Sequence, residues 1–474
     1  MSFTSYSFIF IFLPASLIFY QKLNNNKKKS IYFAISISLI FYIANDAQNI
    51  LVLILSITAN WLFAKYMMGK KYHENKIILF ISIISNIFLL SFFKIPHTWH
   101  FSETANSLLP LGISYYTFTQ ISYLIDVAKG NAHATNAAEY TLFVAWFPHL
   151  PAGPLLSHKE MLPQFLQVSA QEPLMHRCAV GLTLFSMGLF KKVCLSYPFN
   201  SIQGDFFARA ASGSPISTLE AWMACMAFLF EAYLDFSGYS EMAMGISRMF
   251  GIHLPVNFHA PFRSTSPAEF WTRWHITLGR FIHDNIYRPL TKSRKIWRHY
   301  LALMLAMIFV AMWHRVTLPM LAFGLFQGFL IICNNAFRRS SIVSRRGGFI
   351  QQWLGRLFTL VVITFSVCMW AAPDMETSIH IMVTMLGVNS IEIRQPELHH
   401  VLSLMISIFI FWFCPSMMDL IAKELPDWSF QKKNIRPTST QWSLSAPWII
   451  LISFTLSISI LNLSLASDFK YAAF

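Results

Sequence analysis

The sequence predicts an all-α, polytopic membrane protein built from about 11–13 helical spans or re-entrant pieces. Of its 474 residues, 55% are apolar and only 12% are charged, whereas a soluble protein of this size has about a quarter charged residues. The apolar runs are continuous instead of alternating in period two, which excludes a porin-like barrel. Since one span takes about 20 residues, the chain has room for on the order of a dozen helices.

The limits of the apolar runs define the candidate spans. Residues 140–150 and 301–313 are too short to cross a bilayer alone, so we expect tilted or re-entrant pieces there, covered by protein or water. No internal repeat is visible, which counts against a transporter built from inverted repeats. The candidate spans are 5–20, 31–43, 48–64, 77–93, 111–127, 140–150, 179–195, 218–235, 301–313, 317–335, 352–370, 400–422 and 446–463.

An excess of basic residues sets the predicted orientation in the membrane. There are 36 Lys and Arg against 22 Asp and Glu, a net charge of +14, and basic residues in short loops stay in the cytoplasm. The loops at 22–29 and 65–76 are rich in lysine, which places both inside and Met1 outside. Because no basic residue precedes Lys22, the first apolar run lacks the cationic segment of a cleaved signal peptide and is expected to remain as a span.

Residues 251–300 are the longest stretch without a spanning run, and their charge predicts a cytoplasmic segment. Ser266-Pro267-Ala268-Glu269 is a capping box with proline at the first helical position, so a helix should begin there. Apolar side chains then recur every three or four residues until Pro289, which predicts one basic amphipathic helix at the membrane interface. The basic residues are Arg263, Arg273, Arg280, Arg288, Lys292, Arg294, Lys295 and Arg298.

An apolar run from Leu301 to Leu330 is interrupted once, by Trp313-His314-Arg315. As one helix of about 35 residues with its flanks it would be about 50 Å long, well beyond the roughly 30 Å hydrocarbon core. Both flanks are basic, at 294–298 and 338–346. We therefore expect a hairpin with both ends in the cytoplasm and His314 deep in the membrane, near the turn.

Three features place ionisable side chains where chemistry could occur. Burial among apolar residues disfavours the imidazolium of His314 and suits it to act as a general base, the alternative being a structural histidine bonded to neighbouring helices. His275 is either a second catalytic group or an interfacial surface histidine. Asp235–Glu241 groups two carboxylates and three hydroxyls at the predicted end of a span, either as a site or as a helix terminus. The six cysteines show no metal-ligand spacing, so no metal site is expected.

Several short motifs follow one another between residues 109 and 330. They are Leu109–Phe118, Tyr123–Val127, Ala152-Gly153-Pro154, Gly188–Val193, Asp235–Phe250, Gly251–Phe258, Glu269–Leu278 and Trp313-His314. In content and order they resemble the membrane-bound O-acyltransferase (MBOAT) family. The resemblance is strongest to the bacterial branch that acetylates alginate, peptidoglycan or cellulose, with the D-alanyl transferase branch of teichoic-acid modification a near relative.

The resemblance implies helices around a central tunnel, with His314 as the family's catalytic histidine and His275 as the histidine of the upstream Trp-His motif. It implies no redox cofactor and no metal. The family usually has a glycine after the catalytic histidine, where this chain has Arg315. The residues expected to bind substrates are Trp274, Arg273, Asn257, Asp235, Ser237 and Trp313.

By this resemblance the chain is an O-acyltransferase of the bacterial cell inner membrane. Acetyl-CoA, a donor substrate, approaches from the cytoplasm and a hydroxyl acceptor from the other face, so the acetyl group crosses the lipid bilayer. A separate extracytoplasmic O-acetyltransferase partner then completes transfer to a polysaccharide such as peptidoglycan, alginate or cellulose, and no nucleic acid is involved. We expect N-terminal transmembrane helices in 1–108, a catalytic core in 109–335 that includes the cytoplasmic segment 251–300, and C-terminal transmembrane helices in 336–474.

Two other functions stay open on the sequence. A D-alanyl-type transferase would perform the same chemistry with an acyl carrier protein as donor. A non-enzymatic transporter or flippase would use His275 and His314 to line a substrate path or a proton relay. Acyl transfer or hydrolysis of acetyl-CoA by the purified protein would exclude the transporter.

The distribution of basic residues predicts which segments face the cytoplasm, and this prediction can be tested by cysteine labelling. Cysteines introduced at Lys292 and Ser344, in a protein whose exposed native cysteines have been removed, should resist a membrane-impermeant thiol reagent added to intact cells, because both segments are predicted to face the cytoplasm. Labelling of both cysteines from outside would reverse the orientation and the entry side of the donor.

Overall fold

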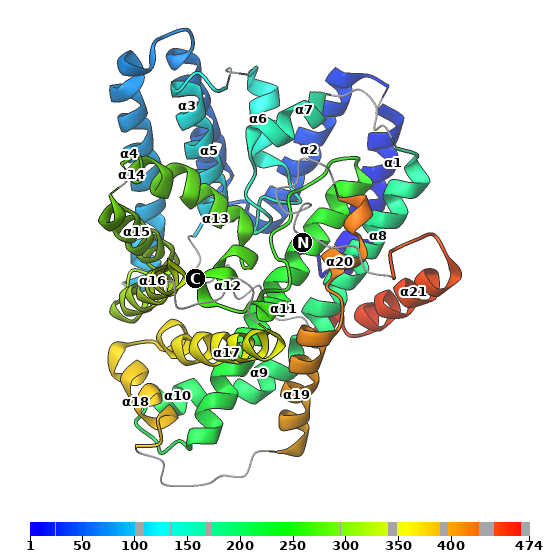
Figure 1. The fold of residues 1–474 in the computed structure, drawn as a ribbon. Helices are drawn as coiled ribbons and strands as arrows, with labels where there is room; N and C mark the ends of the chain where they lie inside the picture. Colours follow the sequence, from blue (N-terminus) through cyan, green and yellow to red (C-terminus); the bar gives the residue numbers. More distant parts are fainter. Residues whose placement is uncertain are drawn as a thin grey trace.

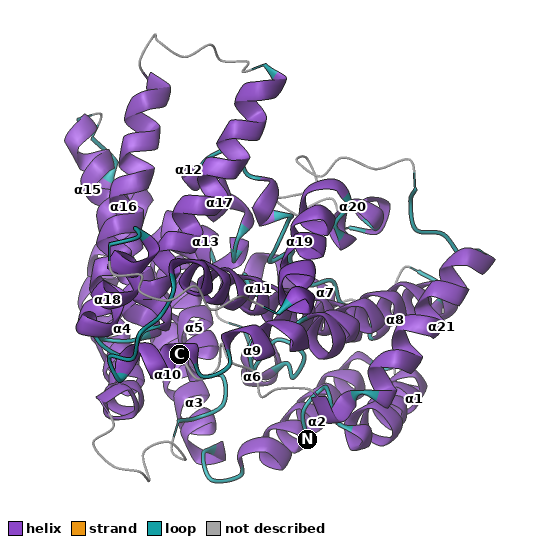
Figure 2. Ribbon diagram, turned by 90° about the horizontal axis from the view of Figure 1, so that it is seen from below, coloured by secondary structure: helices purple, strands orange, loops and turns teal. Residues whose placement is uncertain are grey.

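The described part of the chain is built from helices joined by loops, and it contains no strand (Figures 1 and 2). This computed structural model describes residues 1–23, 25–99, 109–132, 135–166, 172–293, 295–339, 348–388, 397–425 and 440–465. Within these ranges, seven helical segments are long and apolar enough to cross a membrane. The prediction of an all-α, multi-pass membrane protein is confirmed.

Every predicted span overlaps one of the observed helices. The first half of the chain forms α1 (Leu13–Leu23), α2 (Lys27–Asp46), α3 (Ile50–Met67), α4 (Tyr72–Trp99), α5 (Ile113–Ala128), α6 (Ala137–Ala145), α7 (His158–Leu166), α8 (Leu174–Phe190), α9 (Tyr197–Gln203), α10 (Phe206–Ala211) and α11 (Thr218–Met249). The second half forms α12 (Pro267–Arg273), α13 (Ile276–Ile282), α14 (Arg288–Leu290), α15 (Ile296–His314), α16 (Leu318–Arg339), α17 (Phe349–Ala371), α18 (Met375–Met385), α19 (Leu398–Phe413), α20 (Met417–Leu420) and α21 (Ala446–Leu461).

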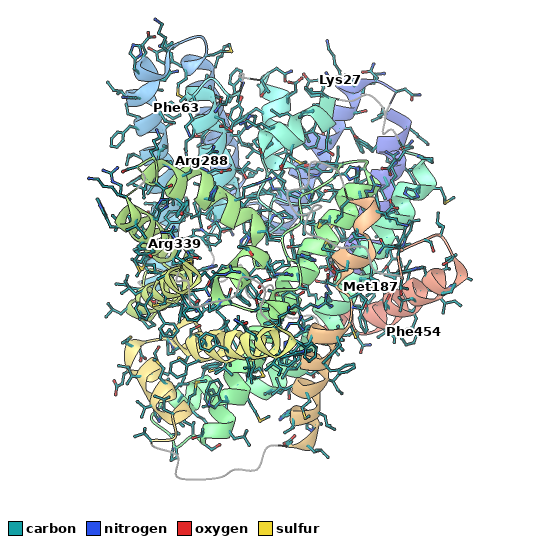
Figure 3. The ribbon with its side chains drawn as sticks, in the orientation of Figure 1. Lys27, Phe63, Met187, Arg288, Arg339 and Phe454 are labelled. Carbon is teal, nitrogen blue, oxygen red and sulfur yellow. The ribbon has the colours of Figure 1, made fainter. Side chains whose placement is uncertain are left out.

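Large apolar side chains cover much of the outer surface. Leu51, Phe80 and Phe454 are 67%, 65% and 60% exposed. Figure 3 labels Phe454 on α21, near Met187 of α8, where these two helices pack together. A soluble monomer rarely exposes large contiguous apolar patches, so this surface fits a lipid environment.

Helix α11 runs through the middle of the fold, and α8 packs closely along it (Figure 1). Glycines make the close approach possible, because a Cβ atom added to Gly188 would lie 2.4 Å from the carbonyl oxygen of Gly238. A Cβ atom on Gly245 would lie 2.5 Å from the carbonyl oxygen of Gly181. Small residues at such crossings let helix backbones meet in membranes, where packing drives association.

The interpretation of Asp235–Glu241 as a helix terminus was wrong, because α11 continues to Met249. The two carboxylates point at the π-helical turn Lys191–Leu195 that follows α8. Lys192 Nζ contacts Asp235, and Lys191 Nζ lies 2.5 Å from Glu241 Oε1. These buried carboxylates are tolerated inside the helix because the neighbouring turn supplies the compensating cations.

The hairpin expected from the interrupted apolar run is confirmed. Helices α15 and α16 pack against each other, and the chain turns between His314 and Leu318. Nineteen residues of α15 at about 1.5 Å each separate His314 from the basic start of the helix by roughly 28 Å.

The single amphipathic helix expected after Ser266 was wrong. Helix α12 ends at Arg273 and α13 begins at Ile276, because His275 has φ of +46°, a left-handed conformation that a right-handed α-helix cannot include. The segment is also not a surface helix, since Trp274 and Leu278 are buried. The break places His275 inside the protein.

The basic loops share one side of the molecule. In Figure 1 the α1–α2 and α3–α4 connections both lie at the top of the view, as expected if both face the cytoplasm. The sidedness itself stays a prediction. Arg294, Ser344, Arg345 and Arg346 lie outside the described residues.

The close contact between α8 and α11 predicts that substituting a glycine at this contact destabilises the protein more than substituting a glycine elsewhere. Gly188→Val should lower the free energy of unfolding by about 1–3 kcal/mol or prevent assembly, because its Cβ atom would overlap the backbone of α11. Gly348→Ala is the matched control, since a Cβ atom there has no neighbour within 4 Å. Thermal unfolding of the purified variants in detergent measures the difference, and equal midpoints for the two would contradict the close crossing.

Candidate active site

His314 ends helix α15 and lies in an aromatic environment. The side chain is 4% exposed. Its ring centroid is 4.4 Å from that of Trp313 and 5.8 Å from that of Trp370, on α17. His314 itself therefore lies inside the protein, whereas the residues of the turn that follows, Arg315 to Thr317, are half-buried.

His275 stands between α12 and α13 with a defined proton arrangement. Its Nδ1 atom lies 3.0 Å from Oδ1 of Asn257. That oxygen also accepts a 2.9 Å hydrogen bond from the hydroxyl of Thr277, so it is an acceptor and Nδ1 of His275 must donate to it. Burial lowers the pKa of His275 to about 3. The neutral ring then carries its lone pair on Nε2.

Asn257 connects this histidine to the central helix. Its side-chain amide nitrogen donates a 3.2 Å hydrogen bond to Oγ of Ser240 on α11, and its main-chain carbonyl oxygen accepts a 2.9 Å hydrogen bond from the backbone N–H of Ile276. Phe236, one turn earlier on α11, packs edge-on against the His275 ring at 4.8 Å. Helix α11 thus positions His275 in two ways: Ser240 holds Asn257, which bonds the ring, and Phe236 packs directly against the ring.

The two histidines border one tryptophan. The Trp313 ring lies 6.2 Å from the His275 ring, in addition to its contact with His314. Its Nε1–H is buried and has no hydrogen-bond partner among the described residues. The structure therefore brings together His275, Trp313 and His314, which are separated in the sequence, and leaves an indole donor unused beside them.

The other residues expected to bind substrates divide into two groups. Trp274 is 3% exposed, stacks on Phe270 and lines a cavity beside His275. Arg273 instead pairs with Glu269 at 2.9 Å. Asp235 is held by a lysine of the neighbouring turn, as described above, and Ser237 is buried in the same helix. Neither Arg273, Asp235 nor Ser237 lines that cavity.

Arg315 stands where the resemblance to the MBOAT family predicts a glycine, and its side chain bonds the end of α17. Its backbone is extended, with φ of −146° and ψ of 138°, so no glycine is needed at this position. The guanidinium donates hydrogen bonds of 2.5 and 3.3 Å to the carbonyl oxygens of Trp370 and Ala372. Arg315 therefore satisfies carbonyls left open at the end of α17.

A cavity of about 510 Å³ lies between α12, α13, α15 and α16. Trp274 and His275 line it, together with apolar residues of α15 such as Met307 and Val310, and Asn335 and Arg338 line it on α16. This volume lies within the range of about 300–1,000 Å³ typical of small-molecule sites. The cavity therefore extends from His275 to Arg338, a basic residue near the end of α16.

A second cavity of about 680 Å³ lies on the other face of α13. Thr277, Arg280 and Phe281 face it, whereas His275, Leu278 and Ile282 face the first cavity. Spacing of three and four residues assigns the two sets to opposite sides of one helix. Five basic side chains line this second cavity: Lys129, Lys159, Arg280, Arg288 and Lys292.

Sequence reasoning missed Lys94, because the predicted span ended at Phe93 whereas α4 continues to Trp99. Lys94 is 7% exposed, and its Nζ lies 5.0 Å from the centroid of the Trp313 ring. The signal that could have found it is an ionisable residue within an apolar helix. Ser240 and Thr277, which hold Asn257, carry no comparable signal.

One group of side chains in the described part of the chain has the spacing of a metal site. Glu397, His399 and His400 place three ligand atoms within 4.8 Å of one another at the start of α19. Glu397 and His399 are exposed, and such groups are common at surfaces.

Comparison with known proteins places most of the chain in one family. Residues 48–371 match the membrane-bound O-acyltransferase (MBOAT) family, so the chain belongs to this family and is a membrane-bound acyltransferase.

The chain is similar in sequence to three named relatives. The peptidoglycan O-acetyltransferase of Helicobacter pylori is 31% identical over 432 residues, which cover 81% of this chain and 80% of the relative. A probable alginate O-acetylase AlgI of Pseudomonas aeruginosa is 32% identical, covering 71% and 66%. A teichoic acid D-alanyltransferase of Streptococcus thermophilus is 26% identical, covering 70% and 83%.

The contact between Asn257 and His275 predicts a positioning role. Asn257→Ala should lower kcat for acyl transfer by about 10-fold or more, because the His275 ring loses the acceptor that selects its tautomer, as in catalytic systems where the orienting group is removed. Asn285→Ala is the control, since the hydrogen bond that the Asn285 side chain makes to the described residues goes to the carbonyl oxygen of Phe281 on the same helical segment. Equal activity of both variants would contradict the role of Asn257.

Proposed function

We propose that this chain moves an acetyl group from cytoplasmic acetyl-CoA through a bacterial inner membrane to a hydroxyl acceptor, for O-acetylation of an extracytoplasmic polysaccharide. The observation that carries the proposal is the shared contact of His275 and His314 with Trp313, next to a cavity lined by His275. The relatives named for peptidoglycan and alginate act on polymers rich in hydroxyl groups.

The cavity between α13 and α16 suits a thioester donor. Its apolar wall matches the uncharged arm of coenzyme A, and Arg338 at the end of α16 matches its phosphates. Guanidinium groups bind phosphate with charge-assisted hydrogen bonds. The basic residues around α14 add long-range attraction for a polyanionic donor.

In the proposed reaction His314 acts as the base. The acceptor hydroxyl gives its proton to His314 while its oxygen bonds to the thioester carbonyl carbon. The tetrahedral intermediate then collapses, the carbon–sulfur bond breaks, and the coenzyme thiolate takes the proton back from His314. The products are an acetyl ester, free coenzyme A and the neutral histidine.

His275 has a different role in this scheme. Its Nδ1–H is committed to Asn257, so only Nε2 faces the substrates, and Nε2 can accept a hydrogen bond but not donate one in the neutral ring. We assign it to orienting the donor at the inner end of the cavity. Proton transfer belongs to His314, at the end of α15.

The acceptor enters from the extracytoplasmic face, and a separate O-acetyltransferase partner completes transfer to the polymer. In this arrangement residues 109–335 form the catalytic core, and the helices before and after it complete the walls. A D-alanyl-type reaction differs only in the donor. Purified protein offered acetyl-CoA or a D-alanyl-loaded carrier protein separates the two donors.

The division of roles between the histidines gives the main test. His314→Asn should abolish acetyl transfer from acetyl-CoA in liposomes, with a loss of about 10²- to 10⁴-fold, since a positioned base is removed. His275→Asn keeps hydrogen-bonding capacity and should retain partial activity. Rates are measured as coenzyme A thiol release and as acetyl ester on added chitotetraose, over a range of donor concentrations.

The exposed His73 provides the matched control, and His73→Asn should behave as wild type. In cells, mass spectrometry of envelope polysaccharides should show no acetyl ester in a strain that carries only the His314→Ala protein. Wild-type ester levels in that strain would refute the assignment of His314. Equal and complete loss in both Asn variants, with donor binding intact, would make His275 an acid–base participant.

A further inference from the structure

A buried lysine stands at the catalytic cluster without a place in the mechanism above. Lys94 is 7% exposed near the end of α4, between Phe93 and Ile95. An ionisable side chain buried in a membrane helix is costly and points to a functional site. Its Nζ lies 5.0 Å from the centroid of the Trp313 ring, within the range of a cation–π contact.

Lys94 reaches the two histidines through Trp313, whose ring centroid lies 4.4 Å from that of His314 and 6.2 Å from that of His275. Arg315 is the cationic residue next to His314 in the chain. Arg315 is committed to the carbonyl oxygens of Trp370 and Ala372. Lys94 comes from a different helix and approaches the cluster from the side of Trp313. The lysine is therefore the cation placed to meet negative charge that develops beside His314.

A cation–π contact of this kind does not require burial. Lys65 makes one, with Nζ 5.1 Å from the Trp61 ring, while remaining exposed on α3. Lys94 makes its contact in a buried position, on the tryptophan that borders both histidines.

We propose that Lys94 is a further catalytic residue, whose ammonium donates a hydrogen bond to the oxyanion of the tetrahedral intermediate. This inference rests on the proposed acyl transfer and supplies a group that neither histidine provides, because His314 holds the transferred proton and Nε2 of His275 is an acceptor. The unused Nε1–H of Trp313 is a second donor in the same place.

The step conserves charge and atoms. When the acceptor oxygen bonds to the carbonyl carbon, the π electron pair moves to the carbonyl oxygen and the acceptor proton moves to His314. Lys94 keeps its protons throughout and only hydrogen-bonds the oxyanion. On collapse the pair returns to the carbonyl, the carbon–sulfur bond breaks and the thiolate takes the proton from His314.

The experiment compares Lys94→Met and Lys94→Arg with the matched control Lys65→Met, using purified protein in liposomes. Acetyl-CoA is the donor, and thiol release is measured both with water alone and with chitotetraose as acceptor. Lys94→Met should lower kcat by about 10²- to 10³-fold, the usual loss for one oxyanion donor. KM for acetyl-CoA should change by less than about threefold, because the contact forms only in the transition state.

Two further readouts separate this role from a structural one. Hydrolysis and transfer should fall together in Lys94→Met, since water and sugar hydroxyls pass through the same kind of intermediate. Lys94→Arg should recover activity, because a guanidinium also donates, and Lys65→Met should match wild type. If Lys94→Met does not assemble, as judged by size exclusion and thermal unfolding, Lys94→Gln takes its place, and an activity at least tenfold below that of Lys94→Arg supports the proposal.

Several results would contradict the catalytic role of Lys94. Wild-type kcat in a folded Lys94→Met or Lys94→Gln protein, equal loss in Lys94→Arg and Lys94→Gln, or an effect confined to KM for chitotetraose would each remove Lys94 from the chemistry while leaving the acyltransferase intact. Absence of acyl transfer in the wild-type protein would instead remove the proposed function, and the inference with it.

Discussion

The contact between α8 and α11 fixes the position of His275, which lies beside Trp313 and His314. Glycine-to-glycine crossings bring the two helices close, and the ion pairs of Lys191 and Lys192 with α11 fix their rotation. Helix α11 then presents Ser240 to Asn257, which in turn holds His275. Since removing one partner of a buried ion pair costs about 3–5 kcal/mol, a rotation of α11 that separates these pairs is disfavoured, and the ring orientation of His275 follows from helix packing.

Both histidines stand where a helix stops, and each stop requires protection from lipid. At His275 the backbone adopts a left-handed conformation. The ring Nδ1–H donates to Oδ1 of Asn257, and the backbone N–H of the next residue, Ile276, donates to the main-chain carbonyl oxygen of Asn257. At His314 the chain turns, and Arg315 occupies the open carbonyls at the end of α17. Irregular backbone at membrane depth persists only where protein covers it.

The sequence by itself determined the class of fold, the positions of the spans and the two histidines. Long apolar runs have few solutions in a membrane, because each backbone amide must be bonded within its own helix. The interruption at His314 predicted a hairpin because the apolar run from Leu301 to Leu330 was too long for one helix to cross the bilayer. Arg273 and Asp235 were also chosen from motif position, yet their charges serve ion pairs with Glu269 and Lys192, since periodicity does not reveal which neighbour a buried charge meets.

Only the tertiary structure decided which residues meet at the site. Lys94, Trp313 and His275 belong to three segments far apart in the chain, and their proximity depends on helix packing that no local pattern encodes. The break at His275 was equally hidden, because an apolar stripe with helical spacing continues across it while the left-handed φ is stabilised by the distant Asn257. Helical periodicity reports how each segment separates apolar from polar surface, whereas the chemistry depends on contacts between segments.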